Sequence, residues 1–403
     1  MTHRDFSGVL IAAGAEVPYR RRAPETSTGD LLADAFSRVL AQSGFSAKDV
    51  DGLGVAAFTL APDHAVDMAW RLGLSPRWCM DDCHGGASAI NMLQHAARAI
   101  QCGDANVVAL LCGDRFETSD FRQLVDHYNL TTRNLLRPLE TGGPNAVFAM
   151  LTQRHARRFD LSPRDYGALC VAQRAWAAQN PNAVYRDPMT LADYLEAPLV
   201  ADPLRRLDCV PVVCGANAII VARANLVRGT RSVRIRALQS LYNTDHQAGD
   251  GLTTPLAVVA PALWQQAGVA PSDMDVISVY DDYPVMALIQ LAELGFAPDG
   301  DIRALLARIA ARELNVNTSG GQLSAGQAGA AGGMHGLVEA ITQLQHGGGE
   351  RQVAGARLAV VSGYGMVEYR YGMCGNAVVL EGVTGQAGQV REAEEAGEAG
   401  EAS

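Results

Sequence analysis

The sequence lacks the features of several protein classes. No apolar run reaches the roughly 18 residues of a membrane-spanning helix, and the first residues lack the basic and then apolar order of a signal peptide. Positive charge is also in deficit, because the formal net charge is -10, and this argues against an extended basic surface for nucleic-acid phosphates. We therefore expect a cytoplasmic protein without a membrane span, acting on a small-molecule substrate.

Paired cysteine spacing is also missing. None of the 8 cysteines forms a Cys-x-x-Cys pair, and several lie in apolar stretches typical of reduced core thiols. These buried candidates are Cys102, Cys112, Cys170 and Cys214. We expect neither a disulfide framework nor a metal site.

The composition that remains is that of a large globular protein. Hydrophobic residues make up 48% of the 403 residues and charged residues only 19%, so the chain can bury a sizeable core. Because a domain has about 150 residues, the length of this chain favours two to three domains. The exception is the acidic, Gly- and Ala-rich stretch 384–403, which we expect to be disordered.

The chain contains an internal repeat. Residues 43–55 and 267–279 each read as a helix ending at glycine, a short acidic turn and an apolar strand. Residues 215–221 and 375–380 read as matching closing strands, and the pairs Gly85-Gly86 and Gly332-Gly333 each open a helix. The repeat predicts a duplicated α/β unit.

Periodicity predicts how each unit is layered. Apolar residues at helical spacing fill 89–100 before Gly103, and the strands at 8–13 and 276–280 are continuously apolar, as in sheets covered on both faces. We predict an N-terminal half at 1–227, carrying a polar insertion over the site at about 115–207, and a C-terminal half at 228–383.

Three sequence blocks then resemble the thiolase superfamily. The segment 82–89, Asp-Cys-His-Gly-Gly-Ala-Ser-Ala, resembles its nucleophile block, and 317–333 resembles its Gly-His-Pro block. The segment 275–283 resembles the His-Asp-Cys-Phe block of the sterol-carrier-protein-type branch. The resemblance covers about residues 6–383 and implies an α/β fold of two similar mixed-sheet halves in α/β/α/β/α layers.

Cys83 is the candidate nucleophile. A thiol at a helix N-terminus meets unpaired backbone N–H groups and the positive end of the helix dipole, which favours the thiolate. Both histidines of the thiolase blocks are replaced, by Gln327 and Tyr280, so no imidazole is left there to activate the sulfur. Gln327 still offers an amide N–H that can bind a thioester carbonyl or enolate oxygen.

Tyr280 lies at the C-terminal end of an expected strand, where α/β sheets place ligands. A phenol is more easily a proton donor than a base at neutral pH. Some lipid-transfer-protein-like members of the superfamily are aldolases with tyrosines at these positions, and Tyr280 matches one of them. The next residue, Asp281, is a candidate to orient Tyr280, and it or Asp282 is a candidate cap of a helix beginning near Pro284.

The remaining candidates surround the substrate. His84 follows the thiol, Cys374 lies in a Gly-rich loop before the last strand, and a Gly-rich loop near 317–321 suits the approach of a thioester. The substrate-binding candidates are His84, Asn317, Ser319, Gly320 and Cys374. Candidates for the phosphates of coenzyme A are Arg133, Arg137, Arg154, Arg157 and Arg158.

Three functions remain open. The first is carbon–carbon bond chemistry on an acyl-CoA in lipid, sterol or aromatic acid metabolism, with acyl transfer through Cys83. The second is retro-aldol cleavage of a 3-hydroxyacyl-CoA with Tyr280 as acid or base, and the third is non-catalytic binding of acyl-CoA or lipid. Coenzyme A enters as part of the substrate and no bound cofactor is expected. The resemblance also implies a homodimer and a small OB-fold, zinc-ribbon partner protein.

Overall fold

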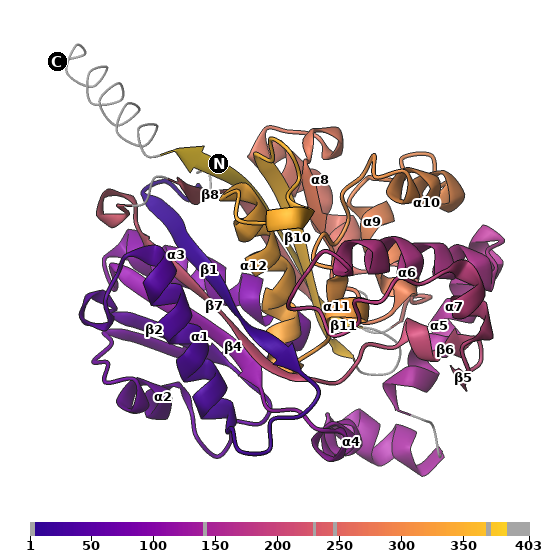
Figure 1. Cartoon of the computed structure of the whole chain (residues 1–403), viewed down its shortest axis with the longest axis horizontal. Coiled ribbons are helices and arrows are strands. Elements are labelled where there is room, and N and C mark those ends of the chain that lie inside the picture. The colour runs from indigo at the N-terminus through magenta and orange to yellow at the C-terminus, as the bar shows by residue number, and fades with distance from the viewer. Residues whose placement is uncertain (1–4, 140–142, 229–230, 245–247, 368–371, 385–403) are drawn as a thin grey trace.

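The computed structural model describes residues 5–139, 143–228, 231–244, 248–367 and 372–384. Among the described residues, nine strands form one continuous sheet with helices on both sides, and two further strands form a small separate hairpin (Figure 1). The predicted tail, apart from Thr384, lies outside the described residues.

Two similar halves build the core of the molecule. The first half contains β1 (Val9–Arg20), α1 (Thr28–Ser43), β2 (Gly52–Ala56), α2 (Ala65–Arg71), β3 (Trp78–Asp81), α3 (Ser88–Cys102), β4 (Val107–Asp114) and β7 (Cys214–Arg223). The second contains β8 (Arg231–Tyr242), α8 (Pro255–Ala267), β9 (Val276–Ser278), α9 (Pro284–Glu293), α10 (Ile302–Ala310), α11 (Gly321–Ala325), α12 (Gly332–Leu344), β10 (Leu358–Val367) and β11 (Gly372–Thr384).

The segment between β4 and β7 is mostly helical. It contains α4 (Thr118–His127), a π-helical turn (Thr132–Leu136), α5 (Pro144–Phe159), α6 (Pro163–Ala177), α7 (Leu191–Glu196) and the small hairpin of β5 (Leu199–Ala201) and β6 (Leu204–Arg205). In Figure 1 its α6 lies beside α10 and α11, and α5 contacts α9, so the segment reaches the second half.

The sheet order confirms the duplication. The strands run β3-β2-β4-β7-β1-β8-β11-β10-β9, and the halves join where β1 pairs briefly with β8. In the first half β2 pairs in parallel with both β3 and β4, in the second β9 pairs in parallel with β10, and the other strand pairs of this sheet are antiparallel. The counterpart of β3 is reduced to a parallel bridge between Ile277 and Val316.

Matching side chains hold matching places in the two halves. Asp51 accepts hydrogen bonds from the backbone N–H of Val107 at 2.9 Å, and Asp275 does the same for Leu358 at 2.9 Å. The helices α1 and α8 both end at a glycine with positive φ, as the repeat predicts. The same sequence signals therefore build both halves.

Two buried asparagines link the halves across the central layer. Asn217 on β7 donates to the carbonyl of Ala331 at the start of α12, at 3.2 Å. Asn376 on β11 donates to the carbonyl of Ala87 at the start of α3, at 2.9 Å. Each half thus fixes the helix entry of the other.

The layers follow from which faces are apolar. The helices α3 and α12 pack between the two halves of the sheet, α1 and α2 cover the outer face of the first half, and α8 to α10 cover that of the second. All of β4 is buried, as the continuous apolar run predicts for a strand covered on both faces. The predicted α/β/α/β/α fold is confirmed.

One element end differs from the prediction. The strand expected to reach Tyr280 ends at Ser278, so Tyr280 lies in the loop that follows β9. Within the described residues, no helix is long and apolar enough to cross a membrane, and no group of three or more His, Cys, Asp or Glu side chains is arranged to hold a metal ion.

Candidate active site

Tyr280 is held by its backbone as well as its hydroxyl. The buried Gln290 on α9 accepts from the Tyr280 N–H at 3.3 Å and donates to the Tyr280 carbonyl at 2.6 Å. Ser362 on β10 donates its hydroxyl to the same Gln290 oxygen at 2.8 Å. These bonds fix the backbone position from which the Tyr280 side chain extends. Nothing in the sequence pattern indicates this role of Gln290.

The phenol oxygen accepts one hydrogen bond. Gln327 donates from Nε2 to the Tyr280 hydroxyl oxygen at 2.8 Å, and its second amide hydrogen points to Oε1 of Gln322 at 3.1 Å. Both hydrogens of Nε2 are therefore used inside the protein. The sequence led us to expect that this amide binds a thioester oxygen. In the structure Gln327 instead positions Tyr280.

Electrostatics keep the phenol protonated. Burial raises the pKa of Tyr280 well above its usual value, and the neighbouring carboxylate of Asp282 raises it further, while the hydrogen bond from Gln327 lowers it. A phenol with a raised pKa that accepts from Gln327 keeps its own O–H for another acceptor. Tyr280 is therefore protonated at neutral pH, and its O–H is available as a hydrogen-bond donor.

The wall opposite Tyr280 is made by Gly86. A Cβ at this position would overlap the ring of Tyr280 and the carbonyl oxygen of Tyr364, so only glycine fits. The ring of Tyr364, on β10, has its centroid 6.5 Å from that of Tyr280. Gly86 and Tyr364 were not among the predicted site residues, although both lie in Gly-rich motifs at element ends.

Cys83 precedes this wall. A 3-10 turn, Gly85–Ala87, separates it from α3, which begins at Ser88, so the thiol is not in the first turn of the helix as expected. The side chain is exposed to solvent. Its role as nucleophile stays a prediction.

Cys374 lies in β11 and pairs there with Tyr242 of β8. It is 4% exposed, and burial raises the pKa of its thiol to about 12, with the charges of Asp82 and Cys83 acting in the same direction. A neutral, buried thiol suits packing better than substrate binding.

His84 is held by a carboxylate. Its Nδ1 lies 3.1 Å from each carboxylate oxygen of Asp82, whose side chain is 1% exposed, while the imidazole itself is 34% exposed. The imidazole of His84 is therefore partly exposed to solvent, and Asp82 fixes its orientation.

Asp281 has a structural role here. Its carboxylate accepts from the backbone N–H groups of Gln322 at 2.9 Å and Leu323 at 3.4 Å, in the first turn of α11, and it is 1% exposed. Burial raises its pKa to about 6 in spite of these bonds. The capping expected at Pro284 is wrong, because the residue before α9 is Tyr283, without a side-chain cap, and Asp281 caps a helix far along the chain.

The loop that leads into α11 packs against the segment that carries Tyr280. Asn317 accepts from the N–H of Val279 at 2.9 Å, and Ser319 pairs with Nε2 of the buried His335 at 2.7 Å. Gly320 has φ of +96°, and a Cβ there would overlap Ala177. Asn317 and Ser319 are at most 3% exposed, so this loop holds Tyr280 in place where the sequence suggested substrate contact.

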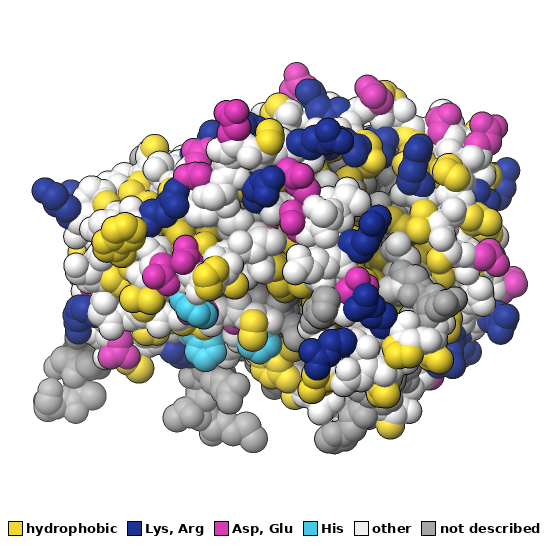
Figure 2. Space-filling view, turned by 90° about the horizontal axis from the view of Figure 1, so that it is seen from below, with side chains coloured by type: hydrophobic (Ala, Val, Ile, Leu, Met, Phe, Trp, Pro, Cys, Tyr) yellow, Lys and Arg dark blue, Asp and Glu magenta, His cyan; other side chains and the backbone are white. Residues whose placement is uncertain are grey.

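The arginine candidates lie on the segment between β4 and β7. Arg154 donates to the carbonyl of Asp250, Arg137 lies 3.4 Å from Asp126, and Arg158 stacks over Phe159. Figure 2 shows Lys and Arg side chains scattered among acidic ones over the face seen from below. Binding of the coenzyme A phosphates by these arginines stays a prediction.

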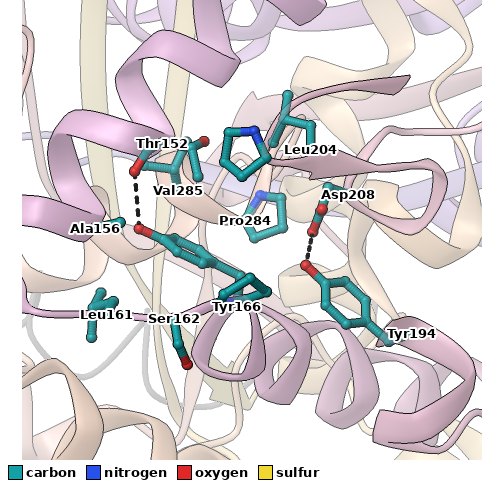
Figure 3. A pocket seen from close by; sticks show the side chains of 12 residues that line it. Thr152, Ala156, Leu161, Ser162, Tyr166, Tyr194, Leu204, Asp208, Pro284 and Val285 are labelled. Carbon is teal, nitrogen blue, oxygen red and sulfur yellow. Dashed lines mark hydrogen bonds between the residues drawn. The ribbon is translucent and has the colours of Figure 1, made fainter. Parts of the chain in front are cut away.

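A separate cavity of about 40 Å³ lies between α5, α6, α7 and the start of α9 (Figure 3). The hydroxyl of Tyr194 points to Asp208 at 2.7 Å, and that of Tyr166 to the Thr152 carbonyl at 3.4 Å. None of the predicted site residues lines it, and its volume suits water rather than an acyl chain.

Comparisons with known proteins agree with this geometry. Residues 239–374 match a family model described as thiolase C-terminal domain-like. The chain is 34% identical over 355 residues to the 17-hydroxy-3-oxo-4-pregnene-20-carboxyl-CoA lyase of Mycobacterium tuberculosis, covering 82% of this chain and 90% of the relative. It is 29% identical over 333 residues to a steroid side-chain-cleaving aldolase of Thermomonospora curvata, covering 77% and 84%.

A solved structure described as Ltp2-ChsH2(DUF35) aldolase shares the fold, with a TM-score of 0.81 at 24% identity over 95% of this chain and 99% of that one. Fold and motif blocks together define a thiolase-fold enzyme. The chain belongs to the thiolase superfamily, in the branch of the sterol-carrier-protein-type thiolases and steroid side-chain aldolases. It is an enzyme that makes or breaks carbon–carbon bonds on acyl-CoA thioesters.

Proposed function

We propose that this protein is a carbon–carbon lyase that cleaves a 3-hydroxyacyl-CoA by a retro-aldol reaction, with Tyr280 as proton donor. The observation that carries the proposal is the hydrogen bond from Gln327 to the Tyr280 hydroxyl at 2.8 Å. Among the described residues it leaves the phenol O–H available as a donor, in the place where thiolases carry a histidine. The names of two relatives support cleavage, since one is a carboxyl-CoA lyase and the other a steroid side-chain-cleaving aldolase.

The reaction divides into two proton transfers. A base takes the proton of the 3-hydroxyl group, the bond between C2 and C3 breaks, and its electron pair moves into the thioester as an enolate. The products are a ketone or aldehyde and a shorter acyl-CoA, once C2 receives a proton. A phenol whose pKa is raised by burial is suited to supply that proton, which is the role proposed for Tyr280.

A Schiff-base route does not fit this sequence. Lys48 is the single lysine of the chain, and it lies exposed in a 3-10 turn before β2. Covalent aldolase chemistry needs an amine in the pocket. Acid–base chemistry is the route that the residues near Tyr280 support.

Acyl transfer through Cys83 is the second candidate, and the exposure of that thiol favours it. It is weaker than cleavage because Gln327 and Tyr280, which replace the two thiolase histidines, bond to each other. The non-catalytic alternative is not retained, because the relatives that define the family are named as enzymes.

The substrate class we propose is a bulky, sterol-like 3-hydroxyacyl-CoA, in which coenzyme A is the carrier that stays on the shorter acyl product. The activity test is incubation with a panel of steroidal, aromatic and straight-chain 3-hydroxyacyl-CoA thioesters, followed by mass spectrometry of the products. Cleavage of no member in the presence of a candidate partner protein contradicts the proposed function.

We also propose a homodimer and a small partner protein of the OB-fold, zinc-ribbon type. Support for the dimer comes from β3, which among the described strands pairs only with β2, and from exposed apolar groups beside it on α2, with Trp70 85% and Val66 67% exposed. Support for the partner comes from the solved structure described as Ltp2-ChsH2(DUF35) aldolase, because this description names two components. Light scattering that shows a 42.7 kDa monomer contradicts the dimer.

A further inference from the structure

The segment before α3 carries an imidazole and a carboxylate in a fixed arrangement. Asp82 accepts from the backbone N–H of His84 at 2.9 Å and lies 3.1 Å from its Nδ1. A carboxylate only accepts, so the hydrogen of the imidazole lies on Nδ1 and the lone pair on Nε2. No hydrogen-bond partner for Nε2 occurs among the described residues.

The carboxylate is itself fixed from two further elements. Asn91 on α3 donates to Asp82 and accepts from the hydroxyl of Tyr242 on β8 at 2.7 Å. The ring of Tyr242 also packs against His84, with centroids 5.4 Å apart. This network sets the ring orientation of His84.

The other titratable groups around His84 come from three elements. Asp82 and Cys83 belong to its own segment, Tyr242 comes from β8, and Cys374 comes from β11 beside Tyr242. Burial raises the pKa of both Tyr242 and Cys374, so these two are neutral neighbours. The carboxylate of Asp82 is the charged group that His84 contacts.

This pair lies next to the phenol site. The carbonyl of His84 packs against Gly365 on β10, and two residues later Gly86 packs against the ring of Tyr280. The same short turn therefore carries the imidazole at one end and forms the wall of the phenol at the other.

We propose that His84, oriented by Asp82, is the base that takes the 3-hydroxyl proton, an inference that rests on the proposed lyase function. In the step, the O–H bond breaks and its proton moves to Nε2 of His84. The C2–C3 electron pair moves into the thioester enolate, and the Tyr280 phenol delivers its proton to C2. Transfer of the proton from His84 back to the phenolate through solvent restores both groups.

The first test is chemical rescue in the purified full-length protein with its active thioester. In H84A, kcat should fall at least about 100-fold, and added imidazole should restore at least about a tenth of the loss. The matched control is H64A, which removes a surface imidazole whose Nδ1 lies 3.7 Å from Asp81, and its kcat should stay within about threefold. A full kcat in H84A, or a loss that imidazole does not restore, overturns the assignment.

The second test separates this inference from the lyase proposal. Exchange of the C2 protons of propionyl-CoA in D₂O reports enolate formation and protonation without any cleavage. H84A should keep this exchange and Y280F should lose it, because only the phenol handles the C2 proton. Exchange lost in H84A overturns the role of His84, whereas a wild-type protein that neither exchanges nor cleaves overturns the lyase function.

Discussion

Gln327 donates its side-chain N–H to the hydroxyl oxygen of Tyr280 across 2.8 Å, although 47 positions separate the two residues. The bond lowers the pKa of a phenol that burial otherwise raises. Because the phenol oxygen accepts this bond, its own hydrogen stays available for another acceptor.

Removing this donor tests how the phenol is held. In Q327L we expect kcat for cleavage to fall about 10- to 100-fold, because the phenolate formed after proton transfer loses its stabilising partner. Binding of the substrate should change little, so KM stays within about threefold. The matched variant is Q327E, which offers no donor when ionised and should fall at least as far; an unchanged kcat in both contradicts the role of Gln327.

Filling the wall opposite the phenol should displace it. In G86A the new methyl group overlaps the ring of Tyr280 and the carbonyl of Tyr364, so we expect at least a 100-fold loss of kcat and about 1–3 kcal/mol of destabilisation. Kinetics and denaturant unfolding measure the two effects. The control is G347A, whose added Cβ meets ordinary contacts of 3.6 Å, and a G86A enzyme as active as G347A would show that the wall is not tight.

Replacing the exposed thiol separates the two candidate reactions. In C83A, retro-aldol cleavage should persist within about threefold, because Tyr280 and Gln327 keep their hydrogen bond. Acyl transfer, by contrast, should vanish with the nucleophile. A loss of cleavage greater than about 100-fold in C83A, measured by product formation, returns Cys83 to the centre of the mechanism.

One buried carboxylate outside the site predicts a pH effect on stability. Burial raises the pKa of Glu293 on α9 to about 8, above its ordinary 4.5, although the N–H of Thr254 donates to it at 2.6 Å. The folded state holds this proton more tightly, so the contribution is present below pH 4.5 and is lost as the pH rises through 8.

In E293Q this loss should be absent. The free energy of unfolding of wild type relative to E293Q should fall by on the order of 4 kcal/mol between pH 5 and pH 8.5, measured by urea unfolding. The control is E313Q, since the Glu313 side chain is 64% exposed. Parallel pH profiles for wild type and E293Q would contradict a raised pKa.

The duplication could be predicted because its signals are local. A glycine with positive φ ends both α1 and α8, and an aspartate before β2 and β9 bonds to the next strand, so the same short motif repeats at the same spacing. Continuous apolar runs also identified the strands covered on both faces. These features depend on neighbours along the chain and are visible in a single sequence.

The site could not be predicted in full, because it depends on contacts between residues that are far apart in the sequence. The carboxylate of Asp281 was expected to act near its own position, but it caps α11 some 41 residues on. The wall of the phenol is Gly86 rather than Cys83, because a 3-10 turn lies between the thiol and the helix. Residue type and strand end were enough to select Tyr280, but not to find Gln290, which clamps its backbone.

The most direct test of the proposed reaction is the product analysis of one 3-hydroxyacyl-CoA turnover with wild type and Y280F, the latter checked against Y185F, whose ring stacks under two arginines. The account predicts a carbonyl compound and a shorter acyl-CoA from wild type and Y185F, no free coenzyme A, and a loss of at least about 1000-fold in Y280F. Release of free coenzyme A with an acyl group on Cys83, or full cleavage by Y280F, would contradict it.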